Sequence, residues 1–430
     1  MISSTSFLNK AIPPFPPLQK GGRGDCSLQK GRTGYSGSSL FAKTVLFLLA
    51  TIFFLSGCAG TREGIKGDSY PGDGKFSIAV FPIENLTGTR APLREIRDSL
   101  INLLRTRGLD VLEDETLEKV MARNRIRYTG GIDDATAQAF GRETRAKGVF
   151  IASLELYSEA NPPKMALISR LISTGDSPTI LWADGVGLAG DDSPGILGVG
   201  LIEDPKILLQ KALEFVSDSL TGSLLMKKGE PGREVKKKFR PKIAYRSPEI
   251  VQGKKYKVAV LPFFNKSERK YGGEIIQLQF IKNLQELGSL EVIEPGLVRQ
   301  QFLKMRLIMD QGVSLADAEA IFATLDADLV VSGDLITYQD YHGALGTPKV
   351  DFSVLFVDGK GRKVVWSSTS YNTGDDGVFF FDTGRVNIAH AMASQMIRWI
   401  GEMMLGESQK IQGGKGSSGP PKQVQKEKMK

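Results

Sequence analysis

The chain has 430 residues, of which 41% are hydrophobic and 24% charged, with 2 Cys, 2 His and a formal net charge of +8. This length allows more than one hydrophobic core, and so few cysteines exclude a disulfide framework. The positive charge does not predict a nucleic-acid-binding face, because it is concentrated in residues 1–57, 226–257 and 407–430 and the rest of the chain is net acidic.

The N-terminal 57 residues contain an extension and a signal peptide. Residues 1–42 are rich in Pro and Gly and show no apolar period, so we interpret them as a non-native-looking or disordered extension, either translated upstream sequence or a long n-region. Residues 43–57 follow the pattern of a secretory signal, with Lys43 before an apolar run. That run is too short to span a hydrocarbon core of about 30 Å as a helix.

The signal ends at Leu55-Ser56-Gly57-Cys58, which resembles the lipobox of bacterial lipoproteins. The alternatives are an ordinary signal peptide that ends near a Cys, or a short buried segment. The resemblance implies that Cys58 is diacylated and becomes the new N-terminus, so that residues 58–75 are a lipidated Cys and a tether. Two acyl chains anchor a protein stably to a membrane. Ala59 stands where an Asp would imply retention in the inner membrane, so the same resemblance implies the periplasmic face of the outer membrane in a cell with two membranes.

The remaining chain contains one unit twice, over residues 76–225 and 256–405. Apolar runs that end at Pro82 and Pro262 begin the two copies, and Trp182 matches Trp366. The separation between matched residues drifts only from 180 to 184. Units of about 150 residues indicate a duplicated domain, since solenoid repeats are much shorter.

Each copy is predicted to fold in the order β-α-β-α-α-β-β-β-α. Apolar residues at helical spacing predict helices near 93–104 and 275–284, and Asp204-Pro205 has the N-cap and first-position signals of a closing helix. Alternation over 349–356 predicts a strand, and a turn near Gly359 predicts a hairpin. The fold class is therefore α/β (α+β), with two tandem domains of a mixed β-sheet packed by helices.

Two further segments lack the pattern of a core. Residues 226–255 are basic and contain Gly and Pro, so we expect a charged linker that acts as a tether. Residues 406–430 are predicted to be a disordered basic tail.

The sequence offers few candidates for chemistry. His390 is expected to be a partly exposed helix residue, and His342 a loop residue whose aromatic neighbours favour local packing or a partner contact. The Asp pairs 191–192 and 375–376 are expected in turns or caps, because adjacent side chains of an extended segment point to opposite faces. Matching turn roles are expected for Asn85 and Asn265. A phosphate loop at 195–201 is discounted because its Gly spacing is wrong. We therefore expect no enzymatic activity and no catalytic, cofactor or metal site, and Cys58 is the one predicted site residue.

The combined pattern resembles the CsgG-like envelope lipoproteins. The resemblance rests on the lipobox, the strand ends at 77–85 and 257–265, the strand 328–338 and the hairpin 350–367. This group includes the curli-secretion lipoprotein, the lipoprotein activators of penicillin-binding proteins and the N-terminal domain of the Tol-system β-propeller protein. The resemblance implies an outer-membrane lipoprotein that acts as a non-enzymatic accessory or assembly factor. Such a protein is attached to the membrane by its lipid and binds envelope proteins, and we expect no nucleic-acid partner. The alternative is a homo-oligomeric secretion pore of the curli-transport type, although no pair of transmembrane hairpins of about 9–11 residues per strand is evident.

Overall fold

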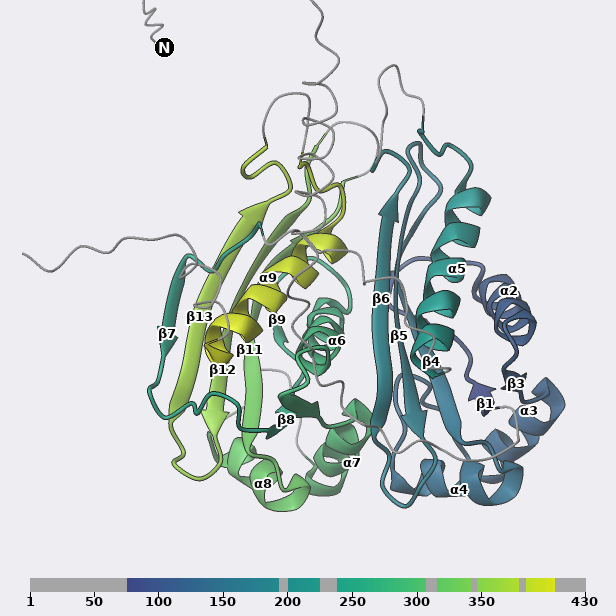
Figure 1. The fold of residues 1–430 in the computed structure, drawn as a ribbon, viewed down its shortest axis with the longest axis horizontal. Coiled ribbons are helices and arrows are strands. Elements are labelled where there is room, and N and C mark those ends of the chain that lie inside the picture. Colours follow the sequence, from purple (N-terminus) through teal and green to yellow (C-terminus); the bar gives the residue numbers. More distant parts are fainter. Residues whose placement is uncertain are drawn as a thin grey trace, which may run out of the picture. The chain divides into compact units, whose positions relative to one another are not determined.

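The computed structural model describes residues 76–192, 200–224, 238–306, 315–341, 346–378 and 384–406 (Figure 1). The predicted N-terminal extension, the signal, Cys58, His342, most of the 195–201 segment and nearly all of the C-terminal tail lie outside these residues. Within them, no helix combines the length and hydrophobicity that crossing a membrane requires.

The first repeat is built on a mixed sheet with strand order β3-β1-β4-β5-β6, and the short β2 pairs with β4. The parallel part contains β1 (Ser77–Val80), β2 (Glu84–Asn85) and β3 (Asp110–Val111). The antiparallel part contains β4 (Gly148–Ser158), β5 (Lys164–Ser173) and β6 (Ile180–Ala189). Helices α2 (Leu93–Thr106) and α5 (Pro205–Leu224) pack on one face, and α3 (Asp114–Arg123) and α4 (Asp134–Thr144) on part of the other.

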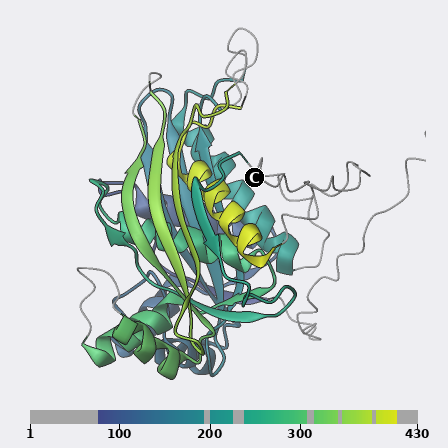
Figure 2. The same cartoon turned by 90° about the vertical axis from the view of Figure 1, so that its left-hand side faces the viewer.

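The second repeat has the same order of elements. Its sheet runs β10-β8-β11-β12-β13-β7, with β9 paired to β11. The strands that match those of the first sheet are β8 (Tyr256–Val260), β9 (Phe264–Asn265), β10 (Leu290–Val292), β11 (Leu329–Gln339), β12 (Lys349–Asp358) and β13 (Val364–Thr373). Helices α6 (Gly272–Gln285) and α9 (Ala389–Leu405) cover one face, and α7 (Pro295–Met305) and α8 (Leu315–Leu325) gather at one end of the other (Figure 2). The predicted fold class is therefore confirmed.

The strand registers show which residues of the two repeats are equivalent. Ile78 is opposite Gly148 in the first sheet, and Val258 is opposite Leu329 in the second. Both sheets have an irregularity at the same place, with Glu155 in β4 and Ile336 in β11 as the inserted residues. This correspondence allows each position of one repeat to be compared with its partner in the other.

The linker prediction requires a correction. Residues 226–255 were expected to be a free tether, but Ile243–Arg246 forms strand β7, which pairs antiparallel with β13 at the edge of the second sheet. Phe239 is buried in the core beneath it. The charge of this segment suggested a solvated spacer, but its few apolar side chains are sufficient to attach it to the second sheet.

The two repeats pack against each other and are not separate domains joined only by the linker. Helices α6 and α9 belong to the second repeat, yet they also contact β6 of the first, so they lie between the two sheets (Figure 1). Ile168 and Ile180 of the first sheet belong to the same core cluster as the apolar residues of the second repeat. The packing is head-to-tail, because helices of one repeat cover the sheet of the other.

Candidate functional site at the contact between the two repeats

The contact depends on small residues in the first sheet. Gly185 and Gly187 lie next to each other on one face of β6, and the His390 ring of α9 lies against them. A Cβ atom at Gly187 would come within 2.6 Å of Ile388 Cδ1 and 2.7 Å of His390 Cδ2, so no larger residue fits without movement. The equivalent residues of β13 are Thr369 and Tyr371, so only the first sheet can accept this histidine closely.

Glu155 lies at the centre of this contact and is only 1% exposed. Its Oε2 atom lies 2.7 Å from Nδ1 of His390 and accepts a hydrogen bond of 3.2 Å from Nε2 of Gln279 in α6. Its Oε1 atom accepts from the Tyr338 hydroxyl, and its backbone carbonyl accepts from the Arg269 guanidinium. All four of these partners come from the second repeat, so Glu155 links the first repeat to α6, α9, β11 and the turn before α6.

The surroundings of Glu155 favour its ionised form. Burial alone raises the pKa of this carboxyl, but the charge and hydrogen bond of His390, the Tyr338 hydrogen bond and the Arg269 charge together lower it below its ordinary value. For Tyr338, burial and the adjacent Glu155 charge raise the pKa well above its ordinary value. The carboxylate is therefore the acceptor of this cluster and the phenol its donor.

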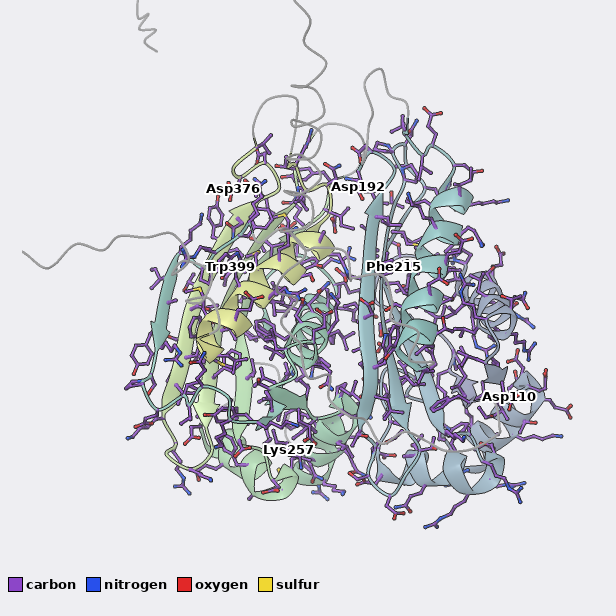
Figure 3. All side chains as sticks on the ribbon, in the orientation of Figure 1. Asp110, Asp192, Phe215, Lys257, Asp376 and Trp399 are labelled. Carbon is purple, nitrogen blue, oxygen red and sulfur yellow. The ribbon has the colours of Figure 1, made fainter. Side chains whose placement is uncertain are left out.

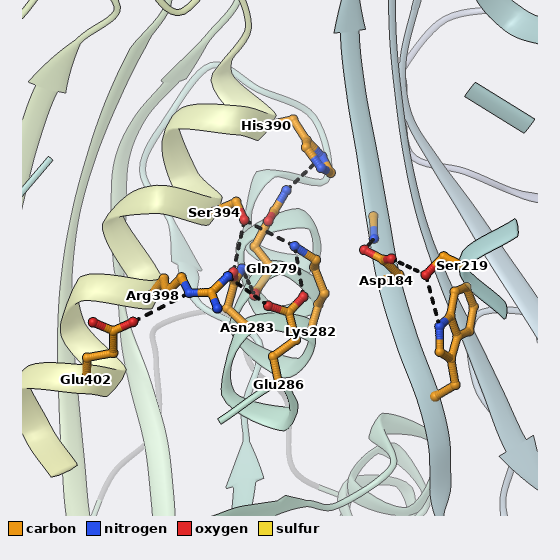
Figure 4. Close-up of polar contacts among 12 residues, drawn as sticks. Asp184, Ser219, Gln279, Lys282, Asn283, Glu286, His390, Ser394, Arg398 and Glu402 are labelled. Carbon is orange, nitrogen blue, oxygen red and sulfur yellow. Dashed lines mark hydrogen bonds and ion pairs between the residues drawn. The ribbon is translucent and has the colours of Figure 1, made fainter. Parts of the chain in front are cut away.

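A second group of polar side chains joins α6 to α9 on the side that faces β6 (Figure 4). Ser394 accepts a hydrogen bond from Lys282 at 3.2 Å and donates one to Asn283 at 2.9 Å. Glu286 pairs with both Lys282 and Arg398, each at 3.3 Å. These contacts fix the two helices to each other, which keeps His390 and Gln279 in position for Glu155.

The other end of the contact contains a buried pair of opposite charges, Arg170 of β5 and Glu294 at the start of α7, both fully buried. Their Nε and Oε2 atoms are 3.7 Å apart, too far for a hydrogen bond, and the Nε and Nη1 atoms of Arg170 have no hydrogen-bond partner. Nη2 donates to the Gly130 carbonyl at 2.7 Å. Glu294 caps α7 through the Gly296 N–H and also accepts from the Ile132 N–H of the first repeat.

Burial raises the pKa of the Glu294 carboxyl, although the Arg170 charge and the two backbone hydrogen bonds oppose that shift. The two buried carboxyls therefore shift in opposite directions. Glu155 has close donors on both oxygens, whereas the Oε2 atom of Glu294 has none. Both clusters serve to join the repeats, and among the described residues no group of three or more His, Cys, Asp or Glu could hold a metal ion.

The predicted turn residues have their expected roles. Asn85 accepts from the Thr87 N–H at 3.0 Å, and Asn265 accepts from the Ser267 N–H at 3.1 Å. Asp192 and Asp376, which lie at the same end of the two sheets (Figure 3), accept from the backbone N–H groups of Ala189 and Thr373.

His390 was predicted to be a partly exposed helix residue, and this was wrong. It is 3% exposed because the glycines of β6 admit its ring. Reasoning from the sequence also missed Glu155, Arg170, Gln279 and Glu294. The available signal was a charged or amide residue inside an otherwise apolar run, which indicates a buried polar partner.

Comparisons with known proteins show distant likeness in fold. No protein-family model and no curated protein matches the chain. Among solved structures, the PelC dodecamer from Paraburkholderia phytofirmans is 20% identical, with 38% of this chain and 94% of that chain covered and a TM-score of 0.27. The lipoprotein GNA1162 from Neisseria meningitidis is 16% identical, with coverages of 34% and 99% and a TM-score of 0.25. The LpoB C-terminal domain from Salmonella enterica is 17% identical, with coverages of 26% and 81% and a TM-score of 0.22.

Proposed function

We propose that this chain is a lipoprotein of the cell envelope, acylated at Cys58 and anchored to the periplasmic face of the outer membrane, that acts as a non-enzymatic accessory or assembly factor. In this proposal the two repeats form one rigid body that binds a protein partner. Support for the anchor comes from the lipobox pattern of residues 55–58. Support for a binding role comes from one exposed surface of the second repeat.

The observation that carries the proposal is the composition of the outer face of the second sheet, defined as the exposed side of β11, β12, β13 and β7. It exposes the side chains of Ile336 (41%), Leu355 (43%), Tyr371 (53%), Ile243 (72%) and Tyr245 (52%). Ser353, Ser367 and Thr369 lie between them on the same face of the strands, which also carries Asp334 and Asp351. Exposed aromatic and aliphatic side chains gathered on one face are typical of a protein–protein interaction site.

The equivalent face of the first sheet indicates what kind of partner fits. There the face is covered by two helices, α6 and α9, which contact it through the polar residues Gln279 and His390 and through apolar residues that share a core cluster with Ile168 and Ile180. We therefore expect the partner to present helices to the outer face. Its contact residues must leave room for Tyr371, which occupies the position of Gly187 in the first sheet.

Site-specific photo-crosslinking in the full lipidated protein tests this proposal. A photoreactive residue in place of Tyr371 should form an adduct with one defined envelope protein, and Leu355→Glu should abolish it because a charge is then buried in the contact. The same residue at Glu118, an exposed position of α3, is the matched control. The proposal requires the captured protein, once purified, to bind the wild type and not L355E. Equal labelling from positions 371 and 118 would reject it.

A homo-oligomeric assembly, including a pore of the curli-transport type, is the second candidate, and the head-to-tail packing of the repeats favours it. That packing leaves the outer sides of α2 and α5 and the outer face of the second sheet available, and these are the two surfaces that a next chain would need. Light scattering on the detergent-extracted lipoprotein separates the candidates. A closed ring of many chains supports assembly, whereas a monomer or dimer excludes the pore.

A further inference from the structure

A cavity of about 370 Å³ lies where the first repeat meets α7 of the second. One wall is the loop after α3, over residues 124–131, and the start of α4. The other wall is formed by the first turns of α7, including Gly296, Arg299 and Gln300. The cavity therefore exists only because the two repeats pack together.

Three arginines, Arg125, Arg127 and Arg299, are among the residues that line this cavity. Among the described residues none of the three is paired with a carboxylate; Arg299 instead lies over the ring of Tyr128, with its Cζ atom 4.3 Å from the ring centroid. Stacking of this kind holds the guanidinium plane while leaving its N–H groups free to bind an anion.

Of the nearby acids, Asp133 and Glu294 accept their hydrogen bonds from groups other than these three arginines. Asp133 accepts from the Thr136 N–H at 2.9 Å and from Nε2 of Gln300 at 3.4 Å. Glu294, behind the Gly131 wall, accepts from the Ile132 and Gly296 N–H groups. Helices α4 and α7 both begin here and add the positive ends of their dipoles.

From this arrangement we propose that the cavity binds a small ligand that carries a phosphate group, with Arg125, Arg127 and Arg299 contacting its oxygens. A carboxylate is satisfied by a single guanidinium fork, whereas a phosphate presents three oxygens and up to two negative charges. Three guanidinium groups from two separate segments match the larger and more highly charged anion. Tyr128, Asn124 and Gln300 remain to contact the rest of the ligand.

The phosphate can come from a soluble metabolite or from a phospholipid headgroup. Calorimetric titration of the full lipidated protein in detergent distinguishes them. Pyrophosphate serves as the first probe, followed by glycerol 1-phosphate for the soluble source and a short-chain phosphatidylglycerol for the lipid source. Tighter binding of either of the last two supports the proposal and identifies the source.

Substitutions of the three arginines test whether pyrophosphate binds in this cavity. Arg299→Gln, and separately the double change Arg125→Gln with Arg127→Gln, should each weaken pyrophosphate binding by about tenfold or more, the effect of losing one charged hydrogen bond. Arg94→Gln removes an exposed guanidinium of α2 and should leave binding unchanged. Circular dichroism and the unfolding midpoint check that each variant is folded. No binding by the wild type, equal binding by all variants, or equal affinity for succinate would overturn the proposal.

Discussion

At the residue scale, Glu155 shows how a polar side chain can specify the contact between two repeats. It is the inserted residue of the irregularity in β4, and the equivalent residue of the second repeat is the exposed Ile336. The copies therefore differ at a position that is buried in one repeat and exposed in the other. A carboxylate is retained in the buried copy because four groups of the other repeat bond to this residue.

Replacing Glu155 by Gln should destabilise the protein at neutral pH by about 1–3 kcal/mol, the cost of a lost charged hydrogen bond at a buried site. Because the folded-state pKa of Glu155 is lowered, its contribution is fully present above the ordinary value of 4.5 and is lost as the pH falls through the folded-state pKa. The wild type should therefore lose stability on acidification more steeply than E155Q. Urea unfolding at several pH values between about 3 and 7 measures this difference.

Glu294 contributes to the pH dependence of stability with the opposite sign. Its folded-state pKa is raised, so its protonation favours the folded state. The comparison between the wild type and E155Q cancels this contribution because both proteins retain Glu294. Glu115→Gln removes an exposed ion pair with Lys119 in α3 and should change the stability by no more than about 0.5 kcal/mol. Equal stability of E155Q and the wild type at neutral pH would contradict the role assigned to Glu155.

The sequence predicted local structure better than contacts between residues far apart. The alternation in β12 and the Pro after Asp204 were sufficient to place a strand and a helix start, since those signals act over a few residues. The contact of His390 with Gly185 joins residues about two hundred positions apart. A periodic pattern within one segment cannot predict such a contact. Comparing the two copies position by position would have indicated it, because Gly187 is matched by Tyr371 and His390 by Lys206.

At the scale of elements, β7 shows why composition alone misplaced the linker. Its residues are all exposed, and its hydrogen bonds to β13 are what hold it in the sheet. The segment is fixed before the strand by Phe239, which is 1% exposed, and after it by Ile250, which is 4% exposed. One buried apolar side chain on each side of a short strand is thus enough to order a segment that is otherwise basic.

Phe239→Ala should therefore cost about 3–5 kcal/mol of stability, as expected for removing a buried aromatic ring. Hydrogen exchange at residues 243–246 should become faster in this variant, because β7 loses the contact that holds it against β13. Phe215→Ala is the matched control, since Phe215 of α5 is 38% exposed and should cost much less. Unchanged exchange in β7 after removal of the Phe239 ring would show that the strand is held independently of it.

At the scale of the whole molecule, the two repeats are expected to unfold together. The largest apolar cluster contains residues of both, including Ile168 and Ile180 of the first sheet, and the polar contacts of Glu155 and Glu294 lie at the same boundary. A chain whose repeats share a core has no boundary at which one part can unfold without exposing the other. Calorimetry should therefore show a single cooperative transition for the wild type.

Gly187→Val tests this coupling directly. A side chain at this position must displace His390 and Ile388, and such overpacking costs typically about 1–3 kcal/mol. Because the strain falls on the contact and not on the apolar clusters that lie within a single repeat, the variant should unfold in two transitions, or in one broadened transition whose van't Hoff enthalpy is smaller than the calorimetric enthalpy. Gly175→Val is the matched control, because nothing lies within 4 Å of a Cβ at Gly175. If G187V instead unfolds in one sharp transition at a lower temperature, the coupling is carried by the whole contact and not by the fit of His390 against β6.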